Sequence, residues 1–427
     1  MSVSRAARRW PSWRAAIALP LTTGAVWLLL GASSTGQPLT GHVSVEGRFF
    51  PETALRDNLQ TANLSIAIES EFYRDLDNAR QAITIVPFFR WDQQDSNRSH
   101  WDFRELTWQY FSDSWEISIG ARKIFWGVTE SKHLVDVVNQ IDLLESFEGE
   151  EKLGQPMVSV STSHSWGLLE TFALIGFRER NYVGQDRRPS IPFPLDSENS
   201  IVEGGKLNLA VRWSHTRGPL DLAVSHFHGT AREPRFFVGN RPLRIAALTL
   251  VSDNEPVLTD LTQLSTVVPA YENIDQAGLE VQLTASGWLL KMEAINRWGQ
   301  GPRFAAVTAG IEYALSNLRS TGIELGILAE YSYDERGLEA LTPIEDDVFV
   351  GARLSLNDVQ ATQFLAGAIV DRLSGASLFS VDASRRLGER SSLNIQMRAF
   401  AGISSADMFL YGLRKDDYVQ AALRVYF

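Results

Sequence analysis

Residues 418–427 read YVQAALRVYF, and apolar side chains occupy every second position of this stretch. A β-strand directs successive side chains to opposite faces, so the stretch predicts a strand with one apolar face and one more polar face. The apolar face carries Val419, Ala421, Leu423, Val425 and Phe427. A strand of this kind fits between an apolar medium on one side and water on the other.

The same alternation recurs from residue 41 onward, in 18 segments separated by turn residues. In the first of them, Val43 and Val45 alternate with Ser44 and Glu46. The segments are 41–50, 64–73, 83–91, 101–111, 115–124, 157–163, 168–178, 207–214, 220–228, 276–285, 288–297, 305–313, 323–333, 348–356, 362–371, 378–384, 393–401 and 418–427. The sequence therefore predicts an all-β protein.

The links between these segments alternate in length. The brief links are 112–114, 164–167, 215–219, 286–287, 316–320, 357–360 and 387–390, and the long ones include 125–154, 179–204 and 229–273. Transmembrane barrels join their strands by short turns at one rim and long loops at the other, which favours an even strand number here. The run from Leu243 to Val251 could form a further strand, but it would break this alternation, so we place it in the longest loop.

Composition excludes several classes of protein. The chain of 427 residues is 44% hydrophobic, yet its mean hydropathy is −0.11 and its only long apolar run lies within the first 32 residues. A spanning helix needs roughly 20 consecutive apolar residues, so a helical membrane protein is excluded. The absence of cysteine excludes disulfides, thiolate metal sites and cysteine nucleophiles, and the formal charge of −11 argues against a general nucleic-acid binder.

The strands of soluble β-sandwiches and propellers also alternate apolar and polar residues, so the two faces of the predicted strands must be compared. One face of segment 288–297 carries Trp288, Leu290 and Met292, whereas the opposite face carries Lys291 and Glu293. A propeller core would not oppose so charged a face, and no blade repeat is evident. Closure into a barrel satisfies every backbone polar group in lipid. We therefore predict a closed antiparallel transmembrane β-barrel of 18 strands as the single domain of residues 33–427.

Residues 1–32 have the composition of an export signal. Four arginines precede the apolar run 15–30, which is followed by the small residues of 31–34. This order of basic, apolar and small residues predicts a secretory signal peptide that is removed near Ala32. A single membrane anchor is the alternative, but Pro20 and Gly24 interrupt the apolar run.

The strand at 418–427 resembles the terminal strand of Gram-negative outer-membrane barrels, whose final phenylalanine acts in assembly recognition. The resemblance implies that Phe427 is an assembly signal read by the barrel-assembly machinery. It also implies residence in the bacterial outer membrane, with outer-membrane lipid and lipopolysaccharide as neighbours.

A second resemblance lies around the third loop, 126–154. Residues 120–127 read GARKIFWG, and they are followed by Glu130-Ser131 and by Asn139-Gln140-Ile141-Asp142. These segments resemble the glycine-basic-tryptophan-glycine strand end and the Asn-Pro-x-Asp-like loop element of porin-like channels of the alginate-export type. The resemblance implies an 18-stranded channel for solutes or polymers, anionic ones among them.

Strand number also argues for permeation, because side chains fill a barrel of 8 strands whereas 16 to 18 strands leave an aqueous channel. The third loop carries seven carboxylates and two lysines. Its apolar residues Leu134, Val137, Val138, Ile141 and Leu144 have helical spacing. We therefore predict that the loop folds inward, and that a short amphipathic helix packs on the wall and holds carboxylates in the pore. An acidic, solvated surface loop is the alternative.

Strand parity assigns ten basic and twelve acidic side chains to the lumen, so no uniform basic ladder exists. Our hypothesis is that the acidic loop faces a basic wall patch, which gives a transverse field that orients polar solutes. Alternatively, the inward ion pairs merely satisfy one another. The residues predicted for the constriction are Arg122, Glu130, Asp136, Asp142, Glu145, Arg48, Arg178, Arg212, Arg353 and Arg398.

Catalytic and metal sites are poorly supported, so we predict no enzyme activity and no cofactor. His226 and His228 share a face, but parity directs it outward, where an interfacial role is favoured over a metal pair. Loop arginines such as Arg232 and Arg235 could bind lipopolysaccharide phosphates or simply be solvated. The predicted function is passive passage of small polar, including anionic, solutes. The alternatives are a barrel enzyme acting on envelope lipid or peptide and a structural barrel plugged by its own loops.

Overall fold

The computed structural model describes residues 39–427, except 57–58, 192, 245–248, 252–255, 259–265, 343 and 405–407. The predicted signal peptide lies outside the described residues. From residue 39 onward, the chain forms an 18-stranded sheet and a separate sheet of six short strands.

All 18 predicted segments coincide with the strands of the large sheet. These are β1 (Thr40–Phe49), β2 (Ala62–Leu76), β3 (Gln81–Asp92), β4 (His100–Phe111), β5 (Trp115–Arg122), β6 (Gln155–His164), β7 (Gly167–Ile175), β9 (Leu207–Arg217) and β10 (Leu220–Thr230). The remaining nine are β16 (Asn273–Ala285), β17 (Trp288–Trp298), β18 (Phe304–Leu315), β19 (Glu324–Asp334), β20 (Asp346–Ser355), β21 (Gln363–Asp371), β22 (Ser377–Arg386), β23 (Ser391–Ala401) and β24 (Tyr418–Tyr426).

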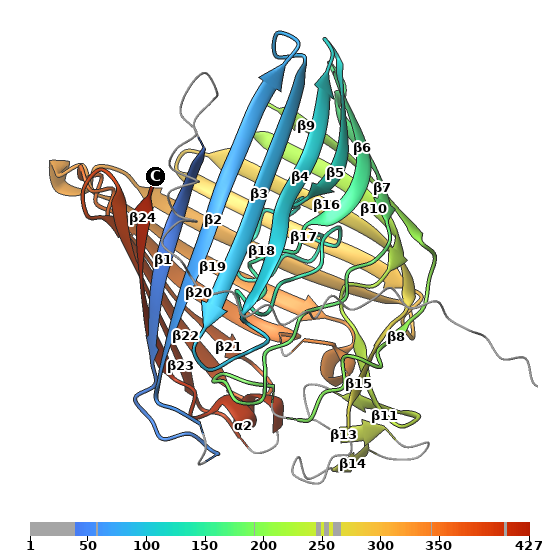
Figure 1. Cartoon of the computed structure of the whole chain (residues 1–427), viewed down its shortest axis with the longest axis vertical. Coiled ribbons are helices and arrows are strands. Elements are labelled where there is room, and N and C mark those ends of the chain that lie inside the picture. The colour runs from blue at the N-terminus through green and yellow to red at the C-terminus, as the bar shows by residue number, and fades with distance from the viewer. Residues whose placement is uncertain are drawn as a thin grey trace, which may run out of the picture. The chain divides into compact units, whose positions relative to one another are not determined.

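The large sheet closes on itself. Each strand pairs antiparallel with the next one in the chain, and β24 pairs with β1 over the register from His42↔Tyr426 to Phe49↔Val419. The backbones of Gly41 and Phe427 exchange two hydrogen bonds at this seam, where Figure 1 shows the first and last strands side by side. Closure pairs both edges, so the predicted antiparallel barrel of 18 strands is confirmed.

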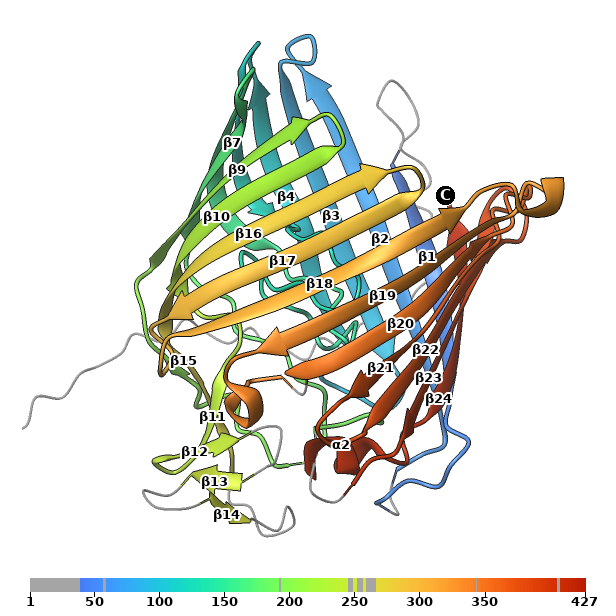
Figure 2. The ribbon, with the colours of Figure 1, turned by 180° about the vertical axis from the view of Figure 1, so that it is seen from behind.

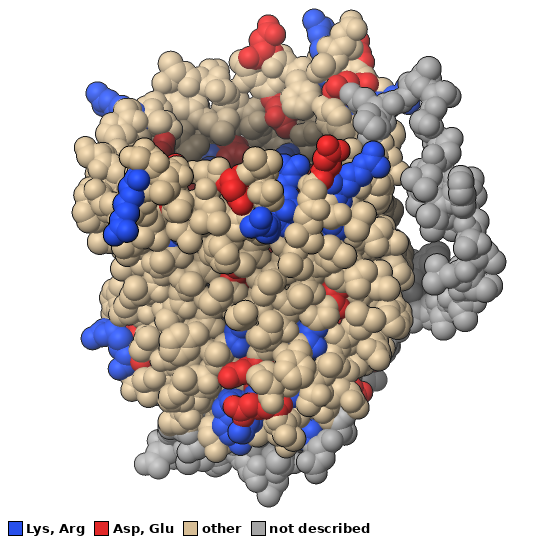
Figure 3. Space-filling model, turned by 90° about the vertical axis from the view of Figure 1, so that its left-hand side faces the viewer, with Lys and Arg blue, Asp and Glu red and all other residues tan. Residues whose placement is uncertain are grey.

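Strand parity sorts the side chains as the sequence predicts. Arg48 and Arg90 are buried inside, whereas their neighbours Phe49 and Phe89 are about half exposed on the outside, at 54% and 50%. Figure 3 shows a belt across the visible face that is nearly free of charged side chains, with charges gathered above and below it. An apolar outer belt on a closed barrel is what a lipid bilayer requires. Among the described residues, no helix is long and apolar enough to span a membrane.

The links differ between the two ends of the barrel. The turn rim carries the short links 77–80, 112–114, 165–166, 218–219, 286–287, 316–323, 356–362 and 387–390. The loop rim carries 50–61, 93–99, 123–154, 176–206, 231–272, 299–303, 335–345, 372–376 and 402–417. The helices lie in these links: η2 (Leu318–Ser320) at the turn rim, η3 (Gly337–Glu339) and α2 (Met408–Leu413) at the loop rim. The long links include every one that the sequence predicts to be long.

The loop rim also carries the six-stranded sheet, which Figure 2 shows below the barrel. Its strands are β8 (Ile201–Val202), β11 (Arg235–Val238), β12 (Arg241–Arg244), β13 (Thr249–Val251), β14 (Pro256–Leu258) and β15 (Val268–Tyr271). The run 243–251 therefore contributes to β12 and β13 and adds no strand to the barrel, as its place in the longest loop predicts. Tyr182, Phe193 and Phe236 pack with Leu243 and Val267 in an apolar cluster beside this sheet.

Candidate functional site

The third loop, 123–154, folds into the barrel, and two wall carboxylates hold it there (Figure 2). Glu293 of β17 accepts hydrogen bonds from the backbone N–H groups of Val128 at 2.7 Å, Thr129 at 3.0 Å and Val135 at 3.2 Å. Glu330 of β19 accepts those of Glu130 and Ser131 at 2.8 and 2.7 Å. The wall thus supplies acceptors for backbone donors that would otherwise be unpaired inside the barrel.

Steric crowding explains why two positions of the GARKIFWG segment are glycine. At Gly120 (φ 138°) a Cβ would lie 2.0 Å from the Leu106 carbonyl oxygen, and at Gly127 (φ 136°) it would lie 2.8 Å from Oε1 of Glu293. Both positions therefore need a residue without a side chain. Asn139 closes the base of the loop: its Nδ2 donates to the carbonyls of Arg122 and Leu153, and its Oδ1 accepts from Ile124.

The loop packs its apolar residues against one half of the inner wall. Trp126 and Val135 are buried against inward side chains of β6, β7, β10 and β16 to β18, such as Phe172 and Phe227. The cluster comprises Trp126, Leu134, Val135, Val137, Val138, Met157, Phe172, Leu174, Ala210, Phe227, Ala231, Ile274, Ile295, Phe304 and Ala306. This half of the barrel is filled.

The predicted amphipathic helix is wrong. Residues 123–154 form turns and isolated bridges, with no helix in this fully described range. The helical spacing of Leu134, Val137 and Val138 reflects burial against a curved wall, and it does not require helical backbone. The backbone N–H groups that Glu293 and Glu330 accept lie between Val128 and Val135, at and before the start of the predicted helix.

Carboxylates along the loop pair with arginines on the wall. Arg90 of β3 donates to Glu145 through Nε at 2.8 Å and Nη2 at 2.7 Å. Arg398 of β23 donates to Glu148 through Nε and through Nη2, the latter at 2.8 Å. Bidentate pairs of this kind fix both orientation and distance.

A third contact lies further along the wall. Arg353 of β20 donates to Glu130 at 2.8 Å, and Lys291 lies 4.0 Å from the same carboxylate. Glu312 lies 3.4 Å from Lys291 and 4.0 Å from Arg353, so wall and loop charges form one network here. An acidic loop therefore faces basic wall residues in the structure.

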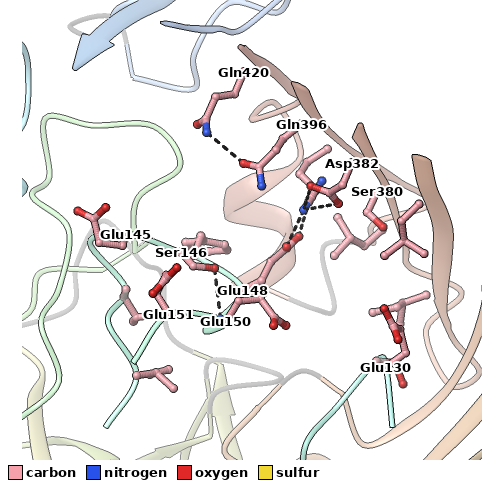
Figure 4. A pocket seen from close by; sticks show the side chains of 18 of the residues that line it. Glu130, Glu145, Ser146, Glu148, Glu150, Glu151, Ser380, Asp382, Gln396 and Gln420 are labelled. Carbon is pink, nitrogen blue, oxygen red and sulfur yellow. Dashed lines mark hydrogen bonds and ion pairs between the residues drawn. The ribbon is translucent and has the colours of Figure 1, made fainter. Parts of the chain in front are cut away.

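A cavity of about 1300 Å³ lies between the loop and the other half of the wall. Residues of β1 to β4 and β20 to β24 line it, with loop residues 125–151 opposite. Figure 4 shows the loop carboxylates Glu145, Glu148 and Glu151 on one side and Asp382, Gln396 and Gln420 on the other. The cavity extends from loop-rim residues such as Leu413 to turn-rim residues such as Arg424.

The predicted constriction residues separate into two groups. Those that line the cavity are Arg48, Glu130, Glu145, Arg353 and Arg398. Those outside its lining are Arg122, Asp136, Asp142, Arg178 and Arg212. The residues of the second group form ion pairs and hydrogen bonds with other residues of the protein.

The contacts of this second group are structural. Asp142 accepts from Arg104 at 2.6 Å, and Asp136 lies 3.0 Å from Lys152. The Arg178 guanidinium donates to Asp102 and to the Gly154 carbonyl, Arg212 pairs with Glu280 and Glu170, and Arg122 lies 3.9 Å from Glu116.

Some lining residues were not singled out by the sequence. Gln420 of β24 accepts from Arg48 at 2.8 Å and donates to Gln396 of β23 at 3.0 Å. Parity places both glutamines inward, but their contact depends on the strand register. Arg98, in the 93–99 link, lies behind the lining: it is 1% exposed and pairs with the lining residue Glu46 at 2.8 Å and with Asp92 at 2.9 Å. No periodic pattern precedes this arginine, so the sequence carries no signal for it.

Burial changes the pKa of several loop groups. It raises the pKa of Asp136, although Lys152 opposes the shift, and it raises the pKa of Glu150. Burial alone would lower the pKa of His133, but the charge of Glu293, 3.7 Å away, outweighs it and raises that pKa. Burial lowers the pKa of Arg232 to about 9.

The loop arginines are mostly held inside the protein. Arg232 donates to the carbonyls of Val138 and Thr230, and Arg188 donates to Asp416 at 2.7 Å. Arg235 pairs with Glu272 at 2.8 Å. His226 and His228 lie on the outer face beside Asp275, at 3.3 and 3.0 Å. Within the described residues no three His, Cys, Asp or Glu side chains form a metal-binding group.

Comparison with known proteins supports the fold. No family model matches the chain, and no curated protein matches it in sequence. The structure is similar to Wzi, described as a carbohydrate-binding outer-membrane β-barrel involved in group 1 capsule assembly in Escherichia coli. The two share 10% identity over 91% of this chain and 85% of that one, with a TM-score of 0.52. This likeness shows a shared barrel fold.

Porins also match, with lower TM-scores. Pseudomonas aeruginosa OpdQ shares 10% identity over 91% of this chain and 97% of its own, at a TM-score of 0.44. A triple mutant of the Rhodopseudomonas blastica porin shares 9% identity over 91% and 99%, at 0.40.

Proposed function

We propose that this protein is a passive channel for polar solutes in the bacterial outer membrane. The observation that carries the proposal is the cavity between the third loop and the wall, which reaches from loop-rim to turn-rim residues within the barrel. The apolar outer belt places the barrel in a membrane, and the predicted signal peptide and terminal Phe427 favour export and assembly there. The turn rim then faces the periplasm.

The third loop forms the constriction in this proposal. Its exposed carboxylate Glu148 meets Arg398, and its Glu130 meets Arg353, so acidic loop groups and basic wall groups lie side by side along the passage. Opposed charges at a narrow point orient the dipole of a passing solute. Anionic cargo, which the alginate-export resemblance implies, belongs to the same hypothesis.

The wall beside these pairs also suits hydroxylated solutes. Ser380, Asn394, Gln396 and Gln420 line the cavity, and amide and hydroxyl groups can replace hydrogen bonds that a solute makes with water. That Wzi is described as carbohydrate-binding agrees with this chemistry in a related barrel.

Planar-bilayer recording of the refolded protein tests the proposal. We expect stable unitary conductance, and a larger conductance when residues 128–151 are replaced by a short glycine-serine linker. A silent bilayer together with lipid or peptide hydrolysis would favour the enzyme alternative. A silent bilayer that conducts only after the replacement would favour a barrel plugged by its loops.

A further inference from the structure

The charges that line the cavity are unequal. Among the described residues, ten carboxylates and seven arginines line it. Five of these arginines lie within 4 Å of a carboxylate, whereas Arg180 and Arg424 have none that close among the described residues. Arg398 lies between Glu148 and Asp382, at 3.0 Å from the latter, and Arg90 lies between Glu145 and Glu46, at 3.3 Å from the latter. A guanidinium held in this way offers little attraction to a passing anion.

Glu150 differs from its neighbours on the loop. It is exposed to the cavity, and no lysine, arginine or histidine lies within 4 Å of its carboxylate among the described residues. The charges of His133 and Lys152, which lie further away, lower its pKa, whereas those of Glu148 and Glu130 raise it. Among the described carboxylates of the loop, Glu150 is therefore the one without a direct ion pair.

The wall of β20 to β23 presents apolar side chains to the same space. Leu365 and Ile369 of β21, Leu378 of β22 and Phe400 of β23 are half-buried and line the cavity. Phe349 lies beside them, and its ring packs over Gly367, where a Cβ would come within 2.4 Å of it. An apolar stripe is unusual in a lumen that water fills, because it gains only from contact with an apolar solute.

The two sides of the passage are thus different in kind. One side carries Glu150, a carboxylate without a direct ion pair, and its acidic neighbours, and the other carries the apolar stripe of Phe349, Leu365, Ile369, Leu378 and Phe400. We propose that the passage selects small organic cations that have an apolar body, such as aryl-alkyl ammonium ions. This inference rests on the channel function proposed above, and it names organic cations in place of the anionic cargo that the alginate-export resemblance implies.

Bilayer recording with matched probes tests the charge preference. Bi-ionic reversal potentials would compare benzylammonium with benzoate, which have similar size and opposite charge. We expect the wild-type protein to favour benzylammonium by about threefold or more. Glu150→Gln removes the charge of this unpaired carboxylate and should reduce this ratio, whereas Glu389→Gln, at an exposed turn of the turn rim, should not.

The apolar stripe has its own readout. Benzylammonium should reduce the potassium current as it occupies the passage, and methylammonium at the same concentration should not. Leu365→Asn should weaken this block by about threefold, since part of a leucine-sized apolar contact is lost. The control Leu373→Asn alters an exposed loop residue and should leave the block unchanged.

The outcomes separate the two proposals. A conducting channel that favours benzoate, or that shows no preference, overturns the cation inference and leaves the channel intact. Block by methylammonium equal to that by benzylammonium overturns the role of the stripe. A protein that folds but never conducts contradicts the channel function itself.

Discussion

The two halves of the barrel interior are built from the same alternating strands but are filled differently. On β6 to β18, inward positions include Phe172, Leu174 and Ile295, which pack against the third loop. On β20 to β24 and β1 to β3, inward positions are mostly polar or charged and line the cavity. The apolar residues of the loop pack on one side only, so the cavity lies between the loop and the opposite wall.

The comparison shows how a wide barrel is narrowed without a separate plug domain. Apolar packing contributes to the attachment on the filled side, at roughly 25 cal/mol per Å² of apolar surface buried. Wall carboxylates fix the loop backbone, and ion pairs hold its acidic tip against the open side. Each contribution can be removed separately by substitution.

The largest effect should follow Glu293→Ala. Three backbone N–H groups and the Thr129 hydroxyl would lose their buried acceptor, and each unsatisfied donor costs about 1–3 kcal/mol. We expect the loop to detach, with raised unitary conductance and rapid protease cleavage within 123–154 in micelles. Glu324→Ala, at an exposed inward position of β19, is the control. Unchanged conductance in the Glu293 variant would show that packing alone holds the loop.

The next largest effect should be a difference in stability between two variants, each with a phenylalanine removed from one half of the barrel interior. Phe172→Ala should lower the free energy of unfolding by about 3 kcal/mol, because it leaves a cavity in a packed cluster. Phe400→Ala should cost about 1 kcal/mol, because its half-buried ring faces the open cavity. Denaturant titration of the refolded barrel in micelles measures both. Equal losses would mean that the open half is packed as tightly as the filled half.

A smaller effect should distinguish carboxylates that face the passage from those that do not. Glu148→Gln leaves Arg398 with Asp382 alone and should change the reversal potential in a salt gradient toward anions, by about twofold in permeability ratio. Asp136→Asn should leave the ratio unchanged, because Asp136 is buried beside Lys152 and outside the cavity lining. A shift in permeability ratio of similar size in both variants would contradict the distinction between carboxylates that line the cavity and those that do not.

Much of the fold could be predicted from the sequence, because a barrel repeats one local rule. The alternation of inward and outward side chains around Val43, Trp288 or Leu423 depends only on the neighbouring residues. Each strand can therefore be predicted from its own sequence. The conformation of the loop 123–154 is harder to predict from the sequence. Its apolar spacing predicts burial correctly, but the acceptors that hold its backbone are Glu293 and Glu330, far away in sequence.

Pairing across the lumen could not be predicted for a related reason. Parity places Arg398, Arg353 and Arg212 inward, but only the path of the third loop decides which of them meets it. Arg212 meets wall carboxylates on β7 and β16, whereas Arg398 meets the loop tip. Charge counts along the chain carry no information about that path.

The smallest effect should be a pH dependence of loop attachment. The pKa of His133 is raised in the folded protein, so the stabilisation from its charge is present below the ordinary histidine pKa and is lost as pH rises through the raised value. Glu293, which anchors the loop, lies 3.7 Å from the His133 ring. The loop should therefore be cut more slowly by protease at pH 6 than at pH 9.

The variant His133→Gln isolates this effect, because a neutral side chain of similar length removes the titration and keeps polar character. Cleavage of the loop in this variant should not vary between the two pH values beyond the change in protease activity, which a soluble peptide substrate measures. His164→Gln, at the turn rim, should keep the wild-type dependence, since its ring lies beside Trp166 away from the loop. A wild-type dependence that persists in His133→Gln would assign the titration to the carboxylates of the loop, Asp136 and Glu150, whose raised pKa values act with the same sign.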